Sequence, residues 1–415
     1  MPYLLLIAAL LTMLIQSFVV STIVKGLILS YVFILVQALV DLFRLPLRKA
    51  TINIYPGLML FVIGFVAYQA LAQLLNVIYL PSFAELPMRV LVSPENPDVA
   101  VMRASLFTQS AYLITCVAFF LYVYKYIASG GAPERVIRIA RIGVLAYVLY
   151  GFVEFTGFLI TGGSVDFISN RITGVDSHYG TFQTITVGGF VIERMKSLAG
   201  EPSMFAFSIV PFVIFFYYLK DRIYLLLLVA ALLSTSTTAI LGLALFGLIE
   251  AVVFRRFFRV AGVAAAIVAI VVLVDPTIIT SLADYTVTKL SLQNSSGIDR
   301  FDNLTSSLSL FAGSDFFHLL FGYGFGYIRS TDGFSTLLVN TGLFGLLMYG
   351  AFSLYPLLKL TYDSGYRKAL LVSNVVLLIL VMVSVPEFYY FHVWFLAALS
   401  WYEYLHRPNP REAQL

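Results

Sequence analysis

Charged residues and cysteine are scarce in this chain. Of its 415 residues, 12% are Asp, Glu, Lys or Arg and 60% are hydrophobic. Soluble globular domains carry about 25% charged residues, so this composition excludes an ordinary soluble domain. The single cysteine, Cys116, lies in an apolar segment. It rules out an intrachain disulfide, and we expect it to be a small core residue.

The regular alternation of polar and apolar residues that barrel strands require is also missing. Residues 225–233 and 369–385 are instead almost unbroken apolar runs. In a membrane such runs form helices, which satisfy their own backbone hydrogen bonds. No basic segment precedes the first apolar run and no cleavage site is evident, so we expect that run to be a retained helix. The predicted fold class is an all-α polytopic membrane protein.

The apolar runs predict how often the chain crosses the bilayer. A crossing helix needs about 20 mostly apolar residues. Separating the runs at polar breaks predicts about twelve spans and one integral membrane domain over residues 1–415. The predicted spans are residues 3–20, 26–43, 55–78, 105–127, 143–160, 203–219, 223–233, 239–254, 260–274, 336–358, 369–385 and 391–405.

The positions of Lys and Arg predict the orientation. If both termini are cytoplasmic, 17 of the 26 basic residues fall on the inner side, in short loops where the positive-inside rule applies best. The other nine basic residues fall on the outer side. They are Lys25, Arg89, Arg103, Arg171, Arg194, Lys196, Lys289, Arg300 and Arg329.

Two long loops, residues 161–200 and 275–335, lie on the outer side in this topology. Loops of this length between helices are uncommon and are usually functional. In the second loop Leu304, Leu308 and Phe311 recur at helical spacing. This pattern predicts a short amphipathic helix on the membrane surface, with Asp299 as its N-cap.

Basic residues of the two loops are candidates for binding an anion. A guanidinium group binds phosphate through two parallel hydrogen bonds and keeps its charge. The alternative is that each contacts lipid phosphates or pairs with a nearby acid such as Glu193 or Asp302. The candidates are Arg171, Arg194, Lys196, Lys289, Arg300 and Arg329.

Glu201 stands directly before Pro202, a residue suited to the first position of a helix. Two interpretations remain open for its carboxylate. It either complements the dipole of that helix, or it accepts a proton from a sugar hydroxyl at the membrane surface. A helix N-terminus weakens a carboxylate as a base, so the second role requires partial burial.

Metal and nucleotide motifs are missing. No Asp-x-Asp pair occurs, and neither His178 nor His318 has a second histidine at metal-ligand spacing, so we predict no metal and no cofactor. The segment from Gly322 to Gly326 lacks the strand-then-helix context of a nucleotide loop. We interpret it as a flexible re-entry into the next helix or, alternatively, as an amide nest for an anion.

Several short motifs in residues 190–350 resemble bacterial O-antigen polymerases of the Wzy type. The first runs from Arg194 through Glu201-Pro202-Ser203 into a helix. The others are Arg300-Phe-Asp-Asn-Leu, Leu320-Phe-Gly-Tyr-Gly-Phe-Gly326, Asp332-Gly-Phe and Asn340-Thr-Gly-Leu-Phe-Gly345.

The resemblance implies a GT-C-like enzyme of the bacterial inner membrane. Such enzymes are inverting, metal-independent glycosyltransferases that join repeat units carried on undecaprenyl pyrophosphate at the outer face. Arg194 and Arg300 would be the arginine of each large loop, and Glu201 would be the base, with Asp299 and His318 in reserve. Further substrate-binding residues would be Arg171, Lys196, Asp299, His318, Tyr323 and Arg329.

The partners expected are the lipid-linked oligosaccharide, membrane lipid and a chain-length regulator protein, without nucleic acid. Two alternatives stay open. A flippase or exporter of lipid-linked oligosaccharide would carry its basic residues inside the helix bundle, whereas here they lie mainly in loops. An O-antigen ligase, which moves finished polymer to another acceptor, is hard to separate from a polymerase by sequence.

Overall fold

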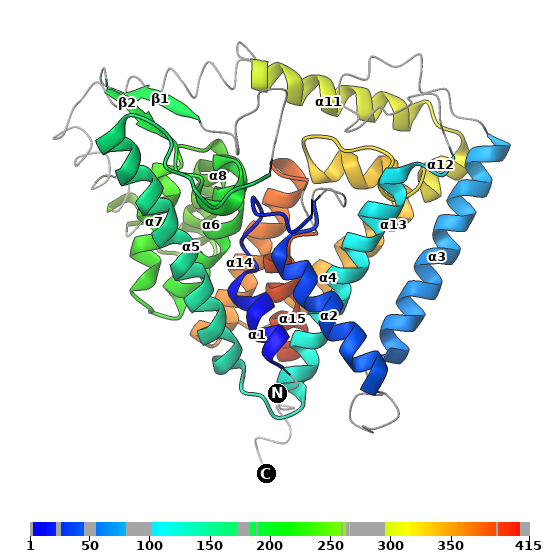
Figure 1. Cartoon of the computed structure of the whole chain (residues 1–415), viewed down its shortest axis with the longest axis horizontal. Coiled ribbons are helices and arrows are strands. Elements are labelled where there is room, and N and C mark those ends of the chain that lie inside the picture. The colour runs from blue at the N-terminus through cyan, green and yellow to red at the C-terminus, as the bar shows by residue number, and fades with distance from the viewer. Residues whose placement is uncertain are drawn as a thin grey trace. The chain divides into compact units, whose positions relative to one another are not determined.

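The structure is a computed structural model of the chain, drawn in Figure 1. It is mostly helical over the residues it describes. Those residues are 3–21, 26–44, 55–79, 101–171, 183–187, 190–258, 260–262, 265, 295–386 and 389–406.

Thirteen α-helices, one 3₁₀ helix and one short hairpin make up this described part of the chain. The hairpin joins β1 (Thr184–Val187) to β2 (Phe190–Glu193) in antiparallel register, with Thr184 opposite Glu193. The helices are α1 (Leu4–Leu11), α2 (Leu29–Arg44), α3 (Tyr55–Ile78), α4 (Ala104–Ala128), α5 (Pro133–Thr161), η3 (Ser197–Ala199), α6 (Pro202–Tyr218), α7 (Ile223–Leu233), α8 (Thr237–Val252), α11 (Ser295–Ala312), α12 (Phe316–Phe321), α13 (Gly333–Lys359), α14 (Gly365–Val383) and α15 (Phe391–Leu405).

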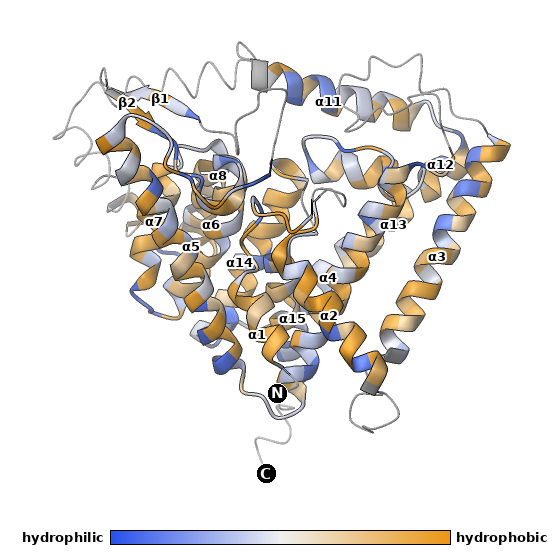
Figure 2. Cartoon of the chain, in the orientation of Figure 1, coloured by the Kyte–Doolittle hydropathy of each residue, from blue (hydrophilic) through white to orange (hydrophobic). Residues whose placement is uncertain are grey.

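Five of the described helices, α3, α4, α5, α13 and α14, are long and apolar enough to cross a membrane. Figure 2 shows apolar residues running along their length. A helix that exposes apolar side chains on most sides is stable in lipid and unstable in water. The architecture is therefore that of a helical membrane protein, and the number of spans stays a prediction.

Most predicted spans coincide with helices to within a few residues, and those at 55–78, 223–233 and 391–405 match α3, α7 and α15. The span predicted at 3–20 is wrong in extent, because α1 ends at Leu11. Beyond it the backbone amides of Gln16 and Ser17 donate to the carbonyl of Leu198, at 2.8 and 2.9 Å, instead of continuing a helix. The span predicted at 260–274 lies almost wholly outside the described residues.

The chain divides into two compact units, each described by itself. Unit 1 comprises Met1–Met13, Leu29–Gly143 and Asp302–Leu415. Its centre is the packing of α15 against α4, where the rings of Phe119 and Phe391 stack with centroids 4.1 Å apart. Cys116 of α4 is fully buried there, as predicted.

Unit 2 comprises Leu14–Ile28 and Val144–Phe301. Its centre is α6, which is apolar on all sides and buried over most of its length. Helices α7 and α8 pack against it, and Figure 1 shows the three side by side. The hairpin and the C-terminal end of α5 lie at the same end of this unit.

Candidate functional site

Arg194 follows the last residue of β2, at the start of a buried segment that leads into α6. Its side chain is only 8% exposed. Nη1 donates to Oε1 of Gln183 at 2.5 Å, and Nε donates to Oγ1 of Thr235 at 3.1 Å. Nη2 donates to the carbonyl of Thr235 at 3.3 Å. These three acceptors are neutral, and together they orient the guanidinium.

Lys196, two residues further on, is 1% exposed and forms two ion pairs. Its Nζ lies 3.0 Å from Oε1 of Glu154 and 2.5 Å from Oδ2 of Asp166. Glu154 belongs to α5, and Asp166 lies in the loop that follows this helix. An ammonium can be buried at this depth only when it is paired and hydrogen-bonded. Lys196 therefore carries an internal charge that is paired with acids, which is one of the alternatives given above for the basic residues of the loops.

The loop acids around Lys196 differ in their electrostatics. Burial by itself raises the pKa of Asp166, but hydrogen bonds from Lys196 and Ser169 and the charge of Lys196 together outweigh it and hold this pKa below its usual range. Burial by itself lowers the pKa of Lys196, but the charges and hydrogen bonds of Glu154 and Asp166 together outweigh it and raise this pKa. Burial raises the pKa of Glu193, whose Oε2 has no hydrogen-bond partner among the residues that the structure describes. Asp166 and Lys196 therefore stay charged, while ionisation of Glu193 is disfavoured.

Glu201 is the N-cap of α6, and Pro202 begins this helix, as predicted. The carboxylate makes no capping hydrogen bond; its Oε2 instead accepts from Oγ of Ser203 at 3.1 Å. The residue is partly buried. It thus meets the condition set above for a base, and its catalytic role stays a prediction.

The remaining predicted basic residues lie on three different segments. Arg171 donates through Nη1 to the carbonyl of Gln16 at 3.4 Å. Arg300 lies in the first half of α11 and, like Arg194, belongs to unit 2. Arg329 is a half-buried residue between α12 and α13, in unit 1. The convergence of Arg194 and Arg300 on one ligand stays a prediction. His178 and Lys289 lie outside the described residues.

The amphipathic helix predicted in the second loop is present as α11, but it starts earlier than expected. It begins at Ser295, so Asp299 lies inside the helix and is not its N-cap. Its buried positions include Asn303 and Leu310, whereas Phe301 and Leu308 are exposed. The exposed apolar positions agree with a helix that meets the membrane surface.

His318 of α12 is fully buried between two acceptors. Nδ1 pairs with Oδ2 of Asp315, and Nε2 lies 2.9 Å from Oδ1 of Asn76. The amide of Asn76 also donates to the carbonyl of Tyr323 at 2.9 Å, which turns its Oδ1 toward the histidine. Both ring nitrogens are therefore engaged by side chains of the fold. The reserve base role of His318 stays a prediction and would require one of these contacts to break.

Tyr323 is buried beneath this histidine and does not face solvent. Its ring stacks on His318 with centroids 4.3 Å apart, and its hydroxyl lies 2.6 Å from Oγ of Ser314. Burial raises the pKa of this phenol. In this structure Tyr323 connects α12 to the loop that follows, so substrate binding by its hydroxyl would require that hydrogen bond to break.

The glycine-rich segment from Gly322 to Gly326 is a loop fixed by hydrogen bonds, and it differs from the flexible re-entry that we predicted. The amides of Tyr323 and Gly324 donate to the carbonyls of Val339 and Asn340, at 3.0 and 2.9 Å. That of Phe325 donates to Oε1 of Gln69 in α3 at 3.2 Å. These three amides are already used, so they cannot form the alternative nest for an anion.

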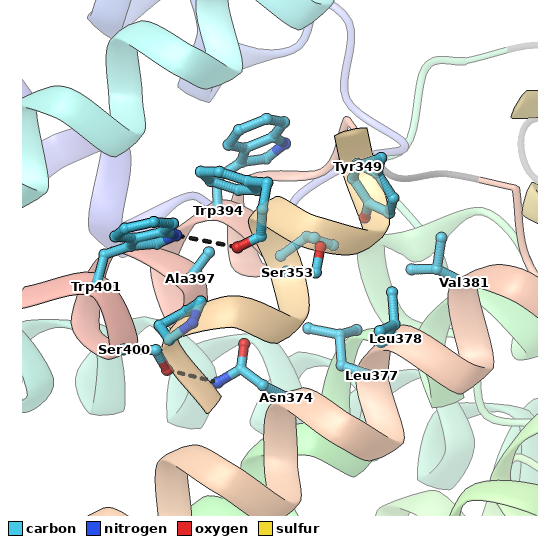
Figure 3. A pocket seen from close by; sticks show the side chains of 13 residues that line it. Tyr349, Ser353, Asn374, Leu377, Leu378, Val381, Trp394, Ala397, Ser400 and Trp401 are labelled. Carbon is cyan, nitrogen blue, oxygen red and sulfur yellow. Dashed lines mark hydrogen bonds between the residues drawn. The ribbon is translucent and has the colours of Figure 1, made fainter. Parts of the chain in front are cut away.

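A pocket lies among α13, α14 and α15 of unit 1 (Figure 3). Trp394 and Trp401 form its aromatic wall. Nδ2 of Asn374 donates to Oγ of Ser400 at 3.1 Å across its lower side. None of the predicted site residues lines this pocket.

Sequence reasoning missed the partners that hold the predicted arginine and lysine. Gln183 and Thr235 are ordinary polar loop residues without a distinguishing pattern. Glu154 does carry a signal, because an acid within an apolar span requires a buried partner. Nothing in the sequence identifies that partner as Lys196, which is 42 residues away.

The chain matches no protein-family description, no curated protein and no solved structure. Among the residues that the structure describes, no group of three or more His, Cys, Asp or Glu is arranged to hold a metal ion.

Proposed function

We propose that the protein is a glycosyltransferase that extends a glycan carried on a lipid diphosphate at the outer face of a bacterial inner membrane. The observation that carries the proposal is the buried guanidinium of Arg194, oriented by Gln183 and Thr235. The Lys and Arg pattern puts its loop on the outer side. The motif resemblance to O-antigen polymerases supplies the reaction class.

The chemistry matches this residue set. The acceptor hydroxyl oxygen attacks the anomeric carbon, the bond to the diphosphate breaks, and the lipid diphosphate leaves with the electron pair. A diphosphate is a good leaving group and needs no proton, unlike the leaving group in glycoside hydrolysis. What the reaction needs is positive charge on the diphosphate, which Arg194 and Arg300 would supply. The hydroxyl proton would pass to Glu201.

The test is to incubate the purified protein with a lipid-diphosphate-linked repeat unit, without metal or nucleotide. We expect a ladder of longer products. Arg194→Ala and Arg300→Ala should each lower the rate by about 10²- to 10³-fold, as is typical when one oriented donor to the developing negative charge is lost. Arg138→Ala, at an exposed position near the start of α5, is the matched control and should retain the rate.

Cells carrying the two variants distinguish the alternatives. A polymerase defect leaves single repeat units on the cell surface. Loss of all surface display would instead indicate an exporter of the lipid-linked unit. Transfer of finished polymer to a different acceptor, without elongation, would indicate a ligase. Undiminished elongation by both arginine variants would contradict the proposed roles.

A further inference from the structure

The segment that carries Arg194 is under backbone strain. Ser197 has a φ of 49°, a left-handed conformation that non-glycine residues rarely adopt. Such a conformation is unfavourable and persists only where the surrounding structure holds it. The backbone is held by Met195, whose amide donates to the carbonyl of Leu233 at 3.1 Å, and by Leu198, whose carbonyl accepts from Gln16. Lys196 lies between these two attachment points.

The side chain of Lys196 connects this segment to two other parts of unit 2. Glu154 brings in α5, and Asp166 brings in the loop after it. Asp166 is itself fixed, because its Oδ1 accepts from the hydroxyl of Tyr150 at 2.8 Å and from the amide of Ser169 at 3.0 Å. A buried ammonium between two such carboxylates permits one geometry, since any displacement leaves a charge unpaired.

We infer that Lys196 is a positioning residue for Arg194: its buried ion pairs with Glu154 and Asp166 fix the segment from which the guanidinium projects. The inference rests on the proposed function for its kinetic test. In this role Lys196 acts through Arg194 and does not contact the substrate, in contrast with the direct substrate contact that the resemblance implied.

A double-mutant cycle tests this role. Lys196→Met should lower kcat by about 10²-fold, the usual cost of misplacing a catalytic group by about 1 Å, with little change in KM. In an Arg194→Ala background the same change should cost almost nothing further, because Lys196 acts through the arginine. Lys220→Met, at an exposed position in unit 2, is the control and should leave kcat unchanged.

Lys196→Met leaves two acids unpaired and risks failing to fold, so a milder variant is needed. Glu154→Gln keeps the shape of the side chain and leaves Lys196 balanced by Asp166. It should fold normally and lower kcat by about tenfold, again only when Arg194 is present. Equal losses of kcat with and without Arg194 would overturn the inference. So would wild-type kcat in both Lys196→Met and Glu154→Gln.

A labelling measurement separates this inference from the proposed function. Cys116 is buried and position 194 is itself mostly buried, so the labelling rate of Arg194→Cys reports how readily this segment opens. Its reaction rate with a water-soluble thiosulfonate should change at least fivefold when Glu154→Gln is added. An unchanged rate would overturn the positioning role. If the wild-type protein makes no ladder of products, the proposed function is wrong, but the labelling result still tests the positioning role of Lys196.

Discussion

At the scale of the residue, burial decides what each charged side chain of unit 2 can do. Glu201, at the start of α6, is half-buried, and its carboxylate accepts a hydrogen bond from the hydroxyl of Ser203. Glu193 is 1% exposed, and no described residue donates a hydrogen bond to its Oε2, so its charge is costly. The two acids lie close together in the sequence, and nothing in the sequence shows which of them is the more deeply buried.

Glu193→Gln should therefore stabilise the protein at neutral pH. Burial raises the pKa of Glu193 in the folded protein above its ordinary value of 4.5. The protonated side chain therefore contributes stability below pH 4.5, and this contribution is lost as the pH rises through the folded-state pKa. Replacing it with an amide removes this loss. The unfolding temperature at pH 8 should rise by about 1–3 °C.

The comparison at pH 4 is the internal control for this prediction. Glu193 is then protonated in both folded and unfolded chains, so the variant and the wild-type protein should unfold at the same temperature. Thermal unfolding in detergent, followed by circular dichroism at both pH values, measures the difference. A variant that is less stable than wild type at pH 8 would mean that the charge of Glu193 is satisfied.

At the scale of the element, a kink in α13 and the polar face of α3 hold the glycine-rich loop. Gly342 interrupts α13 with a φ of 64°. A β-carbon there would collide with the backbone of Leu320 at the end of α12. Gln69 and Asn76 of α3, seven residues apart on one helix face, bind the loop from the other side. This face could have been read from the sequence, because polar side chains at helical spacing in an apolar span need partners.

Gly342→Ala should destabilise unit 1 severely. The new methyl group meets backbone atoms, and the positive φ is unfavourable for alanine, so a loss of about 2 kcal/mol or more is expected. The matched control is Gly350→Ala in the same helix, where a β-carbon meets nothing within 4 Å. That change should be neutral or stabilising by about 0.5–1 kcal/mol. The yield in detergent and the unfolding temperature of the two variants measure the difference. Equal yields and unfolding temperatures would contradict the close packing of Gly342 against Leu320.

At the scale of the whole molecule, orientation follows from the charge pattern. Seventeen of the 26 basic residues are assigned to one side, and the loops that hold Arg194 and Arg300 are assigned to the other. The proposed reaction depends on this assignment, because the arginines must face the side on which lipid-linked glycans are assembled into polymer. Orientation can be measured without any activity.

Cysteine labelling in intact cells should place the loop after α5 outside. Ser164→Cys, at an exposed position of that loop, should react with a membrane-impermeant maleimide. Ser129→Cys, in the exposed turn between α4 and α5, should react only after the cells are opened. The buried Cys116 contributes no background. The reverse pattern would invert the topology and remove the basis of the proposed function.

Sequence alone determined the helical membrane class, most helix boundaries and the start of α6 at Pro202. These features are local, since apolar length or a proline acts within a few residues of itself. Only the tertiary structure decided that Lys196 pairs with Glu154 and Asp166, and that the ring of His318 is hydrogen-bonded to Asn76. These partners are brought together by packing across 30 to 242 residues of chain, and no spacing rule reaches that far.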